Sequence, residues 1–477
     1  MVIDWLLPLA RPARARLVAR RGWLACMLSV SLGAPAAGCG EGDPPVIPGR
    51  DAGPRQDAGP RDAGPRVDGA VDLDGAVDLD GAVDLDGAVD LDGAVDLDGS
   101  APMAGCRIDG TVLPLAMDRR DPFERAVAVV YSGEAFWFAW AESAGAVARI
   151  RMYRLPAAGG DGTIIDVTPD GYRHREPVLT PTAGGGVLVA WIDNGGAGFQ
   201  LSGRLYAPDG TPVTAAVPWT AEPVAHDSPS LTRAGGTWLT SWVESDASGG
   251  VRTVSTRAIG ALAVPSAPAI SLASATAGTL SAQLASLDTR SVLGWSLLMG
   301  DAHVQLTSAS GTLLGDPALL TSEHNGDGSL ALTTTGSRGL AAFGVRVAGF
   351  RPEIRVRSFE LVGAGMPMEQ LRLGSERIVT ESPTQGIQPT VAPFGMGYLV
   401  AFRALPDFPT GTLTTPTVRL SYAAVSGPAV PLLDVAVTTQ AGGGLRIATS
   451  PDGRIALTWA DLEGPAIVLH AARILCD

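Results

Sequence analysis

The sequence contains no lysine, so all 35 of its basic residues are arginine. After residue 105, 32 acidic residues outnumber 26 arginines, and the arginines do not gather into one segment. A nucleic-acid surface needs clustered basic charge. We therefore expect no nucleic-acid partner.

Long apolar runs are also missing, because neither N-terminal run, 2–9 or 23–32, reaches the roughly 20 residues that a membrane-spanning helix needs. The second run follows five arginines between Arg11 and Arg21 and ends in small residues. A charged, then apolar, then small-residue order is typical of a secretory signal. We expect residues 1–38 to be a signal peptide that is removed together with Cys26.

The end of this segment, Ala36-Ala37-Gly38-Cys39, resembles a lipobox, after which signal peptidase II cuts and the cysteine is lipidated. The family usually has leucine at the position of Ala36. The resemblance implies lipidation of Cys39, and Gly40 in place of aspartate implies an outer-membrane destination. Ordinary cleavage beside an incidental cysteine is the alternative. Residues 20–24 look like a twin-arginine export motif, so Sec and twin-arginine export both stay open.

Residues 39–105 lack aromatic side chains and are low in complexity. Asp-Gly-Ala-Val-Asp-Leu is repeated five times over 68–97, and residues 41–105 hold 16 acidic residues against 4 arginines. Such a segment buries too little surface to offset its ordering entropy, so we expect a disordered acidic linker. The spacing matches no specific calcium loop. We expect diffuse calcium association with the linker and no other cofactor.

Cysteine is scarce, with four residues in all. Cys106 and Cys476 bracket the rest of the chain, and an even pair in an exported protein predicts a disulfide. Two free, buried cysteines are the alternative. In the chain-entropy model, closing so long a loop contributes about 4 to 5 kcal/mol.

Between these cysteines a small residue followed by an aromatic recurs seven times. The aromatics are spaced by 51, 51, 53, 48, 59 and 57 residues, and six of the seven pairs follow a turn that contains glycine. A period near 50 with short strands indicates a β-propeller with about four strands per blade. We expect the aromatics to form the blade cores rather than a carbohydrate-stacking stripe. The pairs are Ala139-Trp140, Ala190-Trp191, Ser241-Trp242, Gly294-Trp295, Ala342-Phe343, Ala401-Phe402 and Thr458-Trp459.

The last repeat ends one strand early, after the apolar run 466–475. Directly after Cys106 come a turn, 109–111, and an apolar strand, 112–117, which match the missing strand. We expect the N-terminal strand to complete the last blade. Residues 106–477 are thus predicted to be an all-β, seven-bladed β-propeller. The chain resembles bacterial propeller lipoproteins as an architectural class, which implies no particular activity.

The five histidines show no metal-ligand spacing, and the sequence contains no nucleophile elbow, phosphate loop or dinucleotide motif. Polar residues do recur at equivalent junctions before the innermost strands, where propellers commonly place ligand sites. Solvated loop residues are the alternative. The ligand-rim candidates are Arg173, His174, Arg175, His226, Asp227, His324 and Asp327.

From these features we expect a membrane-anchored surface lipoprotein whose propeller is a non-enzymatic binding module. Its partner would be an envelope protein, a peptide or a glycan, besides the membrane that holds the lipid anchor. Two alternatives stay open. One is a hydrolase or lyase that acts on glycans, and the other is a structural subunit of an envelope complex.

Overall fold

The computed structural model of the chain describes residues 105–476, except 117–126, 145–146, 170–172, 195–198, 221–224, 246–250, 277–278, 298–299, 322, 324–325, 348–350, 367, 381–383, 406–415, 438–443 and 464–465. These residues belong to one compact unit, Asp90–Asp477. The signal peptide, Cys39 and the acidic linker lie outside the described residues and stay predictions.

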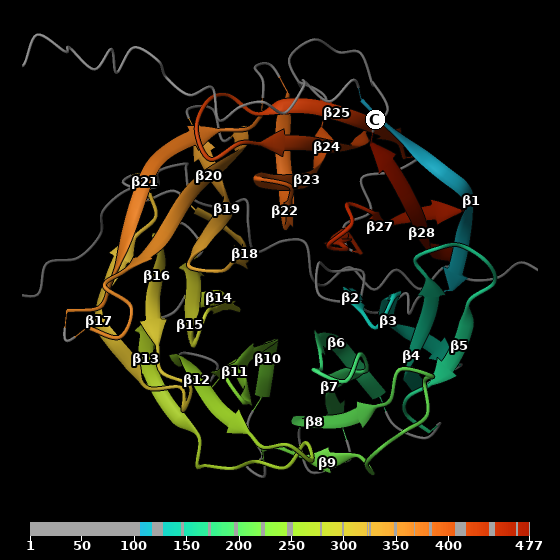
Figure 1. Cartoon of the computed structure of the whole chain (residues 1–477), viewed down its shortest axis with the longest axis horizontal. Helices are drawn as coiled ribbons and strands as arrows, with labels where there is room; N and C mark the ends of the chain where they lie inside the picture. The colour runs from blue at the N-terminus through green and yellow to red at the C-terminus, as the bar shows by residue number, and fades with distance from the viewer. Residues whose placement is uncertain are drawn as a thin grey trace, which may run out of the picture. The chain divides into compact units, whose positions relative to one another are not determined.

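The described residues form β-strands and no helix, and they therefore contain no helix able to cross a membrane. Most strands follow one another in groups of four antiparallel neighbours. One end strand of each group is innermost and is counted as its first strand, and the groups follow one another around a common centre (Figure 1). The predicted all-β, propeller-like architecture is confirmed.

Hydrogen bonding joins the strands into six sheets. The largest runs through β2 (Val127–Ser132), β3 (Ala135–Ala144), β4 (Val147–Pro156), β6 (Arg173–Pro181), β7 (Val187–Asn194), β8 (Phe199–Tyr206) and β9 (Val217–Pro218), and β5 (Thr163–Asp166) pairs with β4. Two groups are fused here because Ala148 on β4 and Arg173 on β6 form one parallel bridge.

The next four sheets have four strands each. They are β10 (Ala225–Ala234), β11 (Thr237–Ser245), β12 (Val251–Ile259) and β13 (Ile270–Thr276); β14 (Thr279–Leu287), β15 (Arg290–Leu297), β16 (Ala302–Thr307) and β17 (Leu313–Leu319); β18 (Gly326–Thr335), β19 (Arg338–Val347), β20 (Arg351–Val362) and β21 (Gln370–Ile378); and β22 (Gln385–Phe394), β23 (Gly397–Leu405), β24 (Thr417–Ala423) and β25 (Val430–Ala436).

The sixth sheet combines the two ends of the described chain. Its order is β1 (Cys106–Ala116), β28 (Ala466–Cys476), β27 (Ile455–Glu463) and β26 (Arg446–Thr449). Cys106 and Cys476 are opposite each other in the β1–β28 ladder, with Cα atoms 4.1 Å apart, and they form the predicted disulfide. The expected turn at 109–111 is instead an irregularity within β1, where the register shifts between Asp109 and Leu113.

The predicted small-aromatic pairs lie on the second strand of each group. All seven aromatic side chains are buried, with exposed fractions of at most 9%, so their role as core is confirmed. Each core cluster draws on two neighbouring groups; Trp137 of β3 and Trp191 of β7, for example, share one cluster. Packing between groups, rather than within one group, therefore supplies the hydrophobic core.

Glycines at the start of the second strand leave room for large side chains of the third strand. A Cβ atom on Gly339 would lie 2.3 Å from the ring of Phe359, and one on Gly397 would lie 2.5 Å from Tyr422 Oη. Both distances are shorter than van der Waals contact. Gly236, in the turn just before β11, has no heavy atom within 4 Å of the position that a Cβ would take. Glycine is thus required for packing at some of these positions and not at others.

We expect Gly339→Ala to lower the free energy of unfolding by about 1 to 3 kcal/mol, because the new methyl group overpacks the Phe359 ring. Gly236→Ala is the matched control and should change it by less than about 0.5 kcal/mol. Urea unfolding followed by tryptophan fluorescence measures both. Equal losses in the two variants would contradict the packing explanation.

Replacing both Cys106 and Cys476 by serine should lower the thermal midpoint by about 5 °C. The disulfide joins residues separated by 370 positions, its loss costs about 4 to 5 kcal/mol, and the unfolding entropy grows with chain length. Calorimetry of the wild type with and without reductant provides the comparison. A midpoint that neither reduction nor the double substitution lowers would refute a stabilising role.

Candidate functional site

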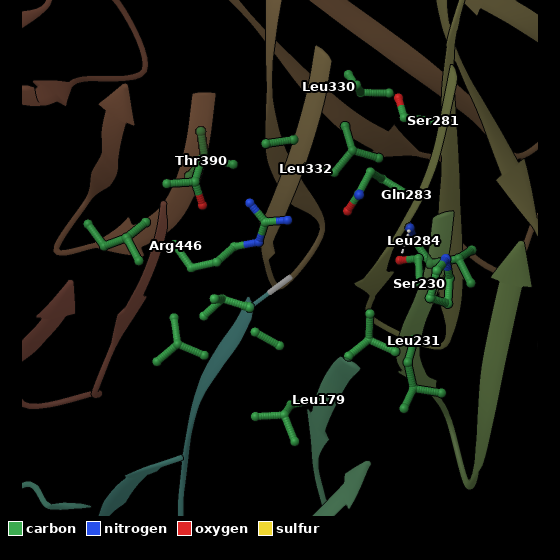
Figure 2. A pocket seen from close by; sticks show the side chains of 18 of the residues that line it. Leu179, Ser230, Leu231, Ser281, Gln283, Leu284, Leu330, Leu332, Thr390 and Arg446 are labelled. Atoms are coloured by element: carbon green, nitrogen blue, oxygen red, sulfur yellow. Dashed lines mark hydrogen bonds between the residues drawn. The ribbon is translucent and has the colours of Figure 1, made fainter. Parts of the chain in front are cut away.

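Two cavities lie along the centre of the ring of innermost strands, with volumes of about 220 and 460 Å³. They share one aliphatic residue from each of seven strands. These boundary residues are Val129, Leu179, Leu231, Leu284, Leu332, Val391 and Ile447. The smaller cavity, drawn in Figure 2, lies toward the end at which the innermost strands begin. We call this end the start rim. Strands β6 and β10, for example, begin there, at Arg173 and Ala225.

The innermost strands carry bulges at the start rim. The ladder of β6 skips Glu176 and Pro177, that of β10 skips Ser228 and Pro229, and that of β22 skips Gln388 and Pro389. Proline lacks the N–H that a ladder needs, so it suits a bulge. The residues before the three prolines have φ angles of 50°, 58° and 57°. Such strained backbone costs about 1 to 3 kcal/mol and clusters at functional sites.

An arginine and two carboxylates meet across the first two of these bulges. Arg175 Nη2 donates a hydrogen bond to Asp227 Oδ1 at 2.8 Å, and Arg175 Nη1 lies 3.7 Å from Glu176 Oε1. The other Glu176 oxygen accepts a hydrogen bond of 2.8 Å from the backbone N–H of Ser228. The side chains of Arg175 and Asp227 are 22% and 25% exposed, so solvent reaches this cluster.

A buried histidine lies beside the cluster. His226 Nδ1 is 2.5 Å from the carbonyl oxygen of Phe199, whose ring stacks under the guanidinium of Arg175 at 4.3 Å. His226 Nε2 is 4.0 Å from Glu244 Oε1, which accepts a hydrogen bond of 2.6 Å from the indole of Trp242. Far from being a solvated loop residue, His226 is fully buried.

The other rim candidates are distributed differently. Arg173 begins β6, and His174 is buried with Nδ1 3.4 Å from Asp193 Oδ1. Asp327 lies on β18. Among the innermost strands, β14 lies between β18 and β10. His324 lies outside the described residues. The structure therefore brings Arg175, His226 and Asp227 together and places Asp327 on another strand of the same rim.

Burial raises the pKa of Asp327, although hydrogen bonds from Ser329 and the charge of Arg346 lower it in part. The backbone N–H and the hydroxyl of Ser329 donate to Asp327 Oδ1 at 2.7 and 2.6 Å. Gly344 makes room for this carboxyl group, since a Cβ there would lie 2.1 Å from Asp327 Oδ2. A carboxyl group with a raised pKa keeps its proton to higher pH and is suited to act as an acid.

Several polar residues of the rim and cavity were missed from the sequence. Glu176 belongs to the rim cluster, Glu244 contacts the neighbouring His226, and Arg446 and Gln283 line the smaller cavity. The recurrence of proline at 177, 229 and 389 was the available signal, because it marks the bulges. Among the described residues, no group of three histidine, cysteine or carboxylate side chains is placed to hold a metal ion.

The pH dependence of stability provides a test of the Asp327 environment. Because its pKa is raised in the folded state, stability should fall as the pH rises from the unfolded value through the folded pKa. Asp327→Asn removes this cost, so its thermal midpoint relative to wild type should be higher at pH 7 than at pH 3.5. Asp209 is the control, because hydrogen bonds from Thr211 lower its pKa. The effect of Asp209→Asn on the thermal midpoint should therefore change with pH in the opposite direction. A wild-type minus variant difference that does not change with pH would contradict the assignment.

No model of a known protein family matches the chain, and no curated protein matches it either. Solved structures of similar fold include polysaccharide lyase Uly1, at 11% identity over 80% of this chain and 95% of that one, with a TM-score of 0.44. A mutant NanB sialidase from Streptococcus pneumoniae is 8% identical over 80% and 71%, with a TM-score of 0.42. The GH43 endo-arabinanase from Bacillus licheniformis is 11% identical over 53% and 99%, with a TM-score of 0.31.

These comparisons correct the functional expectation drawn from the sequence. A non-enzymatic binding module was the main prediction, and the comparisons contradict it as the main assignment: the similar structures are named as a sialidase, a polysaccharide lyase and an endo-arabinanase.

Proposed function

We propose that this domain is a propeller-based enzyme, a hydrolase or lyase, that cleaves a glycan at the start rim. The observation that carries the proposal is the contact of one guanidinium, that of Arg175, with the carboxylates of Asp227 and Glu176. This cluster directly precedes Pro177 and Pro229, which line the smaller cavity. Charged groups and a concave surface thus meet at one place.

The cluster has the groups that glycan cleavage requires. Glycoside hydrolysis uses two carboxyl groups, one as acid and one as base or nucleophile. A lyase needs a base that takes a proton and a cation that stabilises the developing negative charge. Asp227 and Glu176 are the carboxylates assigned to these roles, and Arg175 is the cation. Asp327, whose pKa is raised by burial, adds a third carboxyl group at the same rim.

The architecture assigned to this enzyme is a closed, seven-bladed propeller. Its support is the order of contacts among the innermost strands, in which each contacts the next from β2 to β26, and β26 contacts β2. We place this domain on a lipid anchor at Cys39, at the end of the acidic linker and at the outer membrane. The export signal and the lipobox resemblance support that location.

A panel of neutral and acidic polysaccharides incubated with the purified full chain tests the activity. Reducing-end release reports hydrolysis, and the ultraviolet absorbance of an unsaturated product reports a lyase. Asp227→Asn should lower turnover about 100-fold or more, because it removes a group that transfers a proton. The side-chain oxygen of the asparagine can still accept a hydrogen bond from Arg175.

Asp209→Asn is the matched control, since Asp209 is a fully exposed aspartate in the turn after β8, at the opposite end of that strand from Phe199. It should leave turnover unchanged, with both variants keeping the wild-type thermal midpoint within a few degrees. The proposal fails when no polysaccharide of the panel is cleaved, or when Asp227→Asn cleaves as fast as the wild type.

A further inference from the structure

His226 is fully buried, so a substrate at the start rim has no access to its imidazole ring. The residue nevertheless directly precedes Asp227, the carboxylate that the Arg175 guanidinium contacts. Its ring contacts β8 and faces β11, the second strand of its own group. A side chain in this position can act on the proposed site only through the groups that it contacts.

The carbonyl partner of the imidazole defines which ring nitrogen carries a proton. Nδ1 of His226 lies 2.5 Å from the backbone carbonyl oxygen of Phe199. A carbonyl oxygen only accepts hydrogen bonds, so Nδ1 carries the proton and donates it. Nε2 lies 4.0 Å from Glu244 Oε1, which is beyond hydrogen-bonding distance. The carbonyl group of Phe199 is therefore the contact that orients the ring.

Phe199 connects this hydrogen bond to Arg175. It is the first residue of β8, and its ring lies under the guanidinium, with Arg175 Cζ 4.3 Å from the ring centre. A cation at this distance from an aromatic face is attracted by it. Because His226 holds the Phe199 carbonyl, it also holds the backbone that carries the ring. The imidazole thus supports the surface against which the guanidinium lies.

A second connection runs through the main chain of His226. Arg175 Nη2 donates to the His226 carbonyl oxygen at 3.3 Å and to Asp227 Oδ1 at 2.8 Å. One residue therefore contacts Arg175 through its main chain and supports Phe199 through its side chain. Together these contacts restrict an arginine side chain that has many rotamers when it is free.

We infer that His226 is a positioning residue, which holds the Arg175 guanidinium at the start rim through the carbonyl group of Phe199. The inference rests on the proposed function in that it assigns a role within the proposed site. There Arg175 is the cation that stabilises developing negative charge, and such a group acts best when it is held in place beforehand. His226 itself touches no substrate and transfers no proton.

The rate at which phenylglyoxal modifies Arg175, followed by peptide mass spectrometry of the full chain, tests the positioning without any turnover. The Arg175 side chain is 22% exposed, so the reagent reaches it. His226→Leu should speed this modification about 10-fold, because it removes the hydrogen bond that holds Phe199. His226→Asn should stay within about 2-fold of the wild type, because its side-chain N–H can replace the Nδ1 donor.

Arg151 is the internal control, because its side chain is also 22% exposed and its partners are carboxylates of the group β2 to β5. Its modification rate should be the same in every variant. Phe199→Leu is a second test that leaves His226 intact. It removes the aromatic ring under the guanidinium and should speed the modification of Arg175 about 3-fold or more.

Three results would overturn the inference. One is an Arg175 rate that neither His226→Leu nor Phe199→Leu changes. Another is a rise of equal size at Arg151, because it would report a general loosening of the fold. The third is an equal rise in His226→Asn and His226→Leu, because the donor at Nδ1 would then have no effect.

The outcomes for positioning and for turnover can be separated. On a polysaccharide that the wild type cleaves, His226→Leu should lower kcat about 10-fold with little change in KM, and His226→Asn should restore kcat. An unchanged kcat in His226→Leu overturns the inference and leaves the enzymatic proposal intact. A wild type that cleaves no polysaccharide refutes the enzymatic proposal, and the modification rates then decide whether His226 positions Arg175.

Discussion

Burial of both faces of each sheet is the constraint on which this domain depends. The second strands are buried almost from end to end, as in β7, β19 and β23, whereas every residue of the fourth strands β17 and β21 is half-buried or exposed. An apolar face of one group is covered only by the next group. The first group meets the last for this reason, since Phe136 of β3 and Leu469 of β28 belong to one core cluster. A shorter array would expose an apolar face at each end.

The same constraint explains the role of the N-terminal strand, β1. β1 pairs with β28 and is the one strand of its sheet that no turn connects to its neighbour in the described chain. Backbone pairing alone would leave this edge the easiest place to open. The Cys106–Cys476 bond lies at the end of that ladder and supplies the covalent connection that a turn supplies elsewhere.

Features that repeat along the chain were predictable, and features that depend on a single contact were not. The small-aromatic pairs recur because every group buries an aromatic side chain against a neighbouring group. Their spacing therefore indicated the architecture. The contact of Arg175 with Asp227 joins residues 52 positions apart, and Gln283 faces Arg446 from a distant part of the chain (Figure 2). Bulges at Glu176 and Ser228 also interrupt the alternation of side chains along a strand, which removes the periodic signal on which such predictions rely.

The rim cluster is assembled across the boundary between two groups, so its geometry depends on how those groups pack. Leu188 and Ile192 of β7 share a core cluster with Trp242 of β11, and the same two groups are in contact through β6 and β10. Left-handed backbone at Glu176 and Ser228 persists only where the surroundings over-determine it, and this packing provides such surroundings. Burial between sheets therefore both stabilises the ring and holds Arg175, Glu176 and Asp227 in one arrangement. A site of this kind is pre-formed before any ligand arrives, because its charged groups are positioned by the core and not by the ligand.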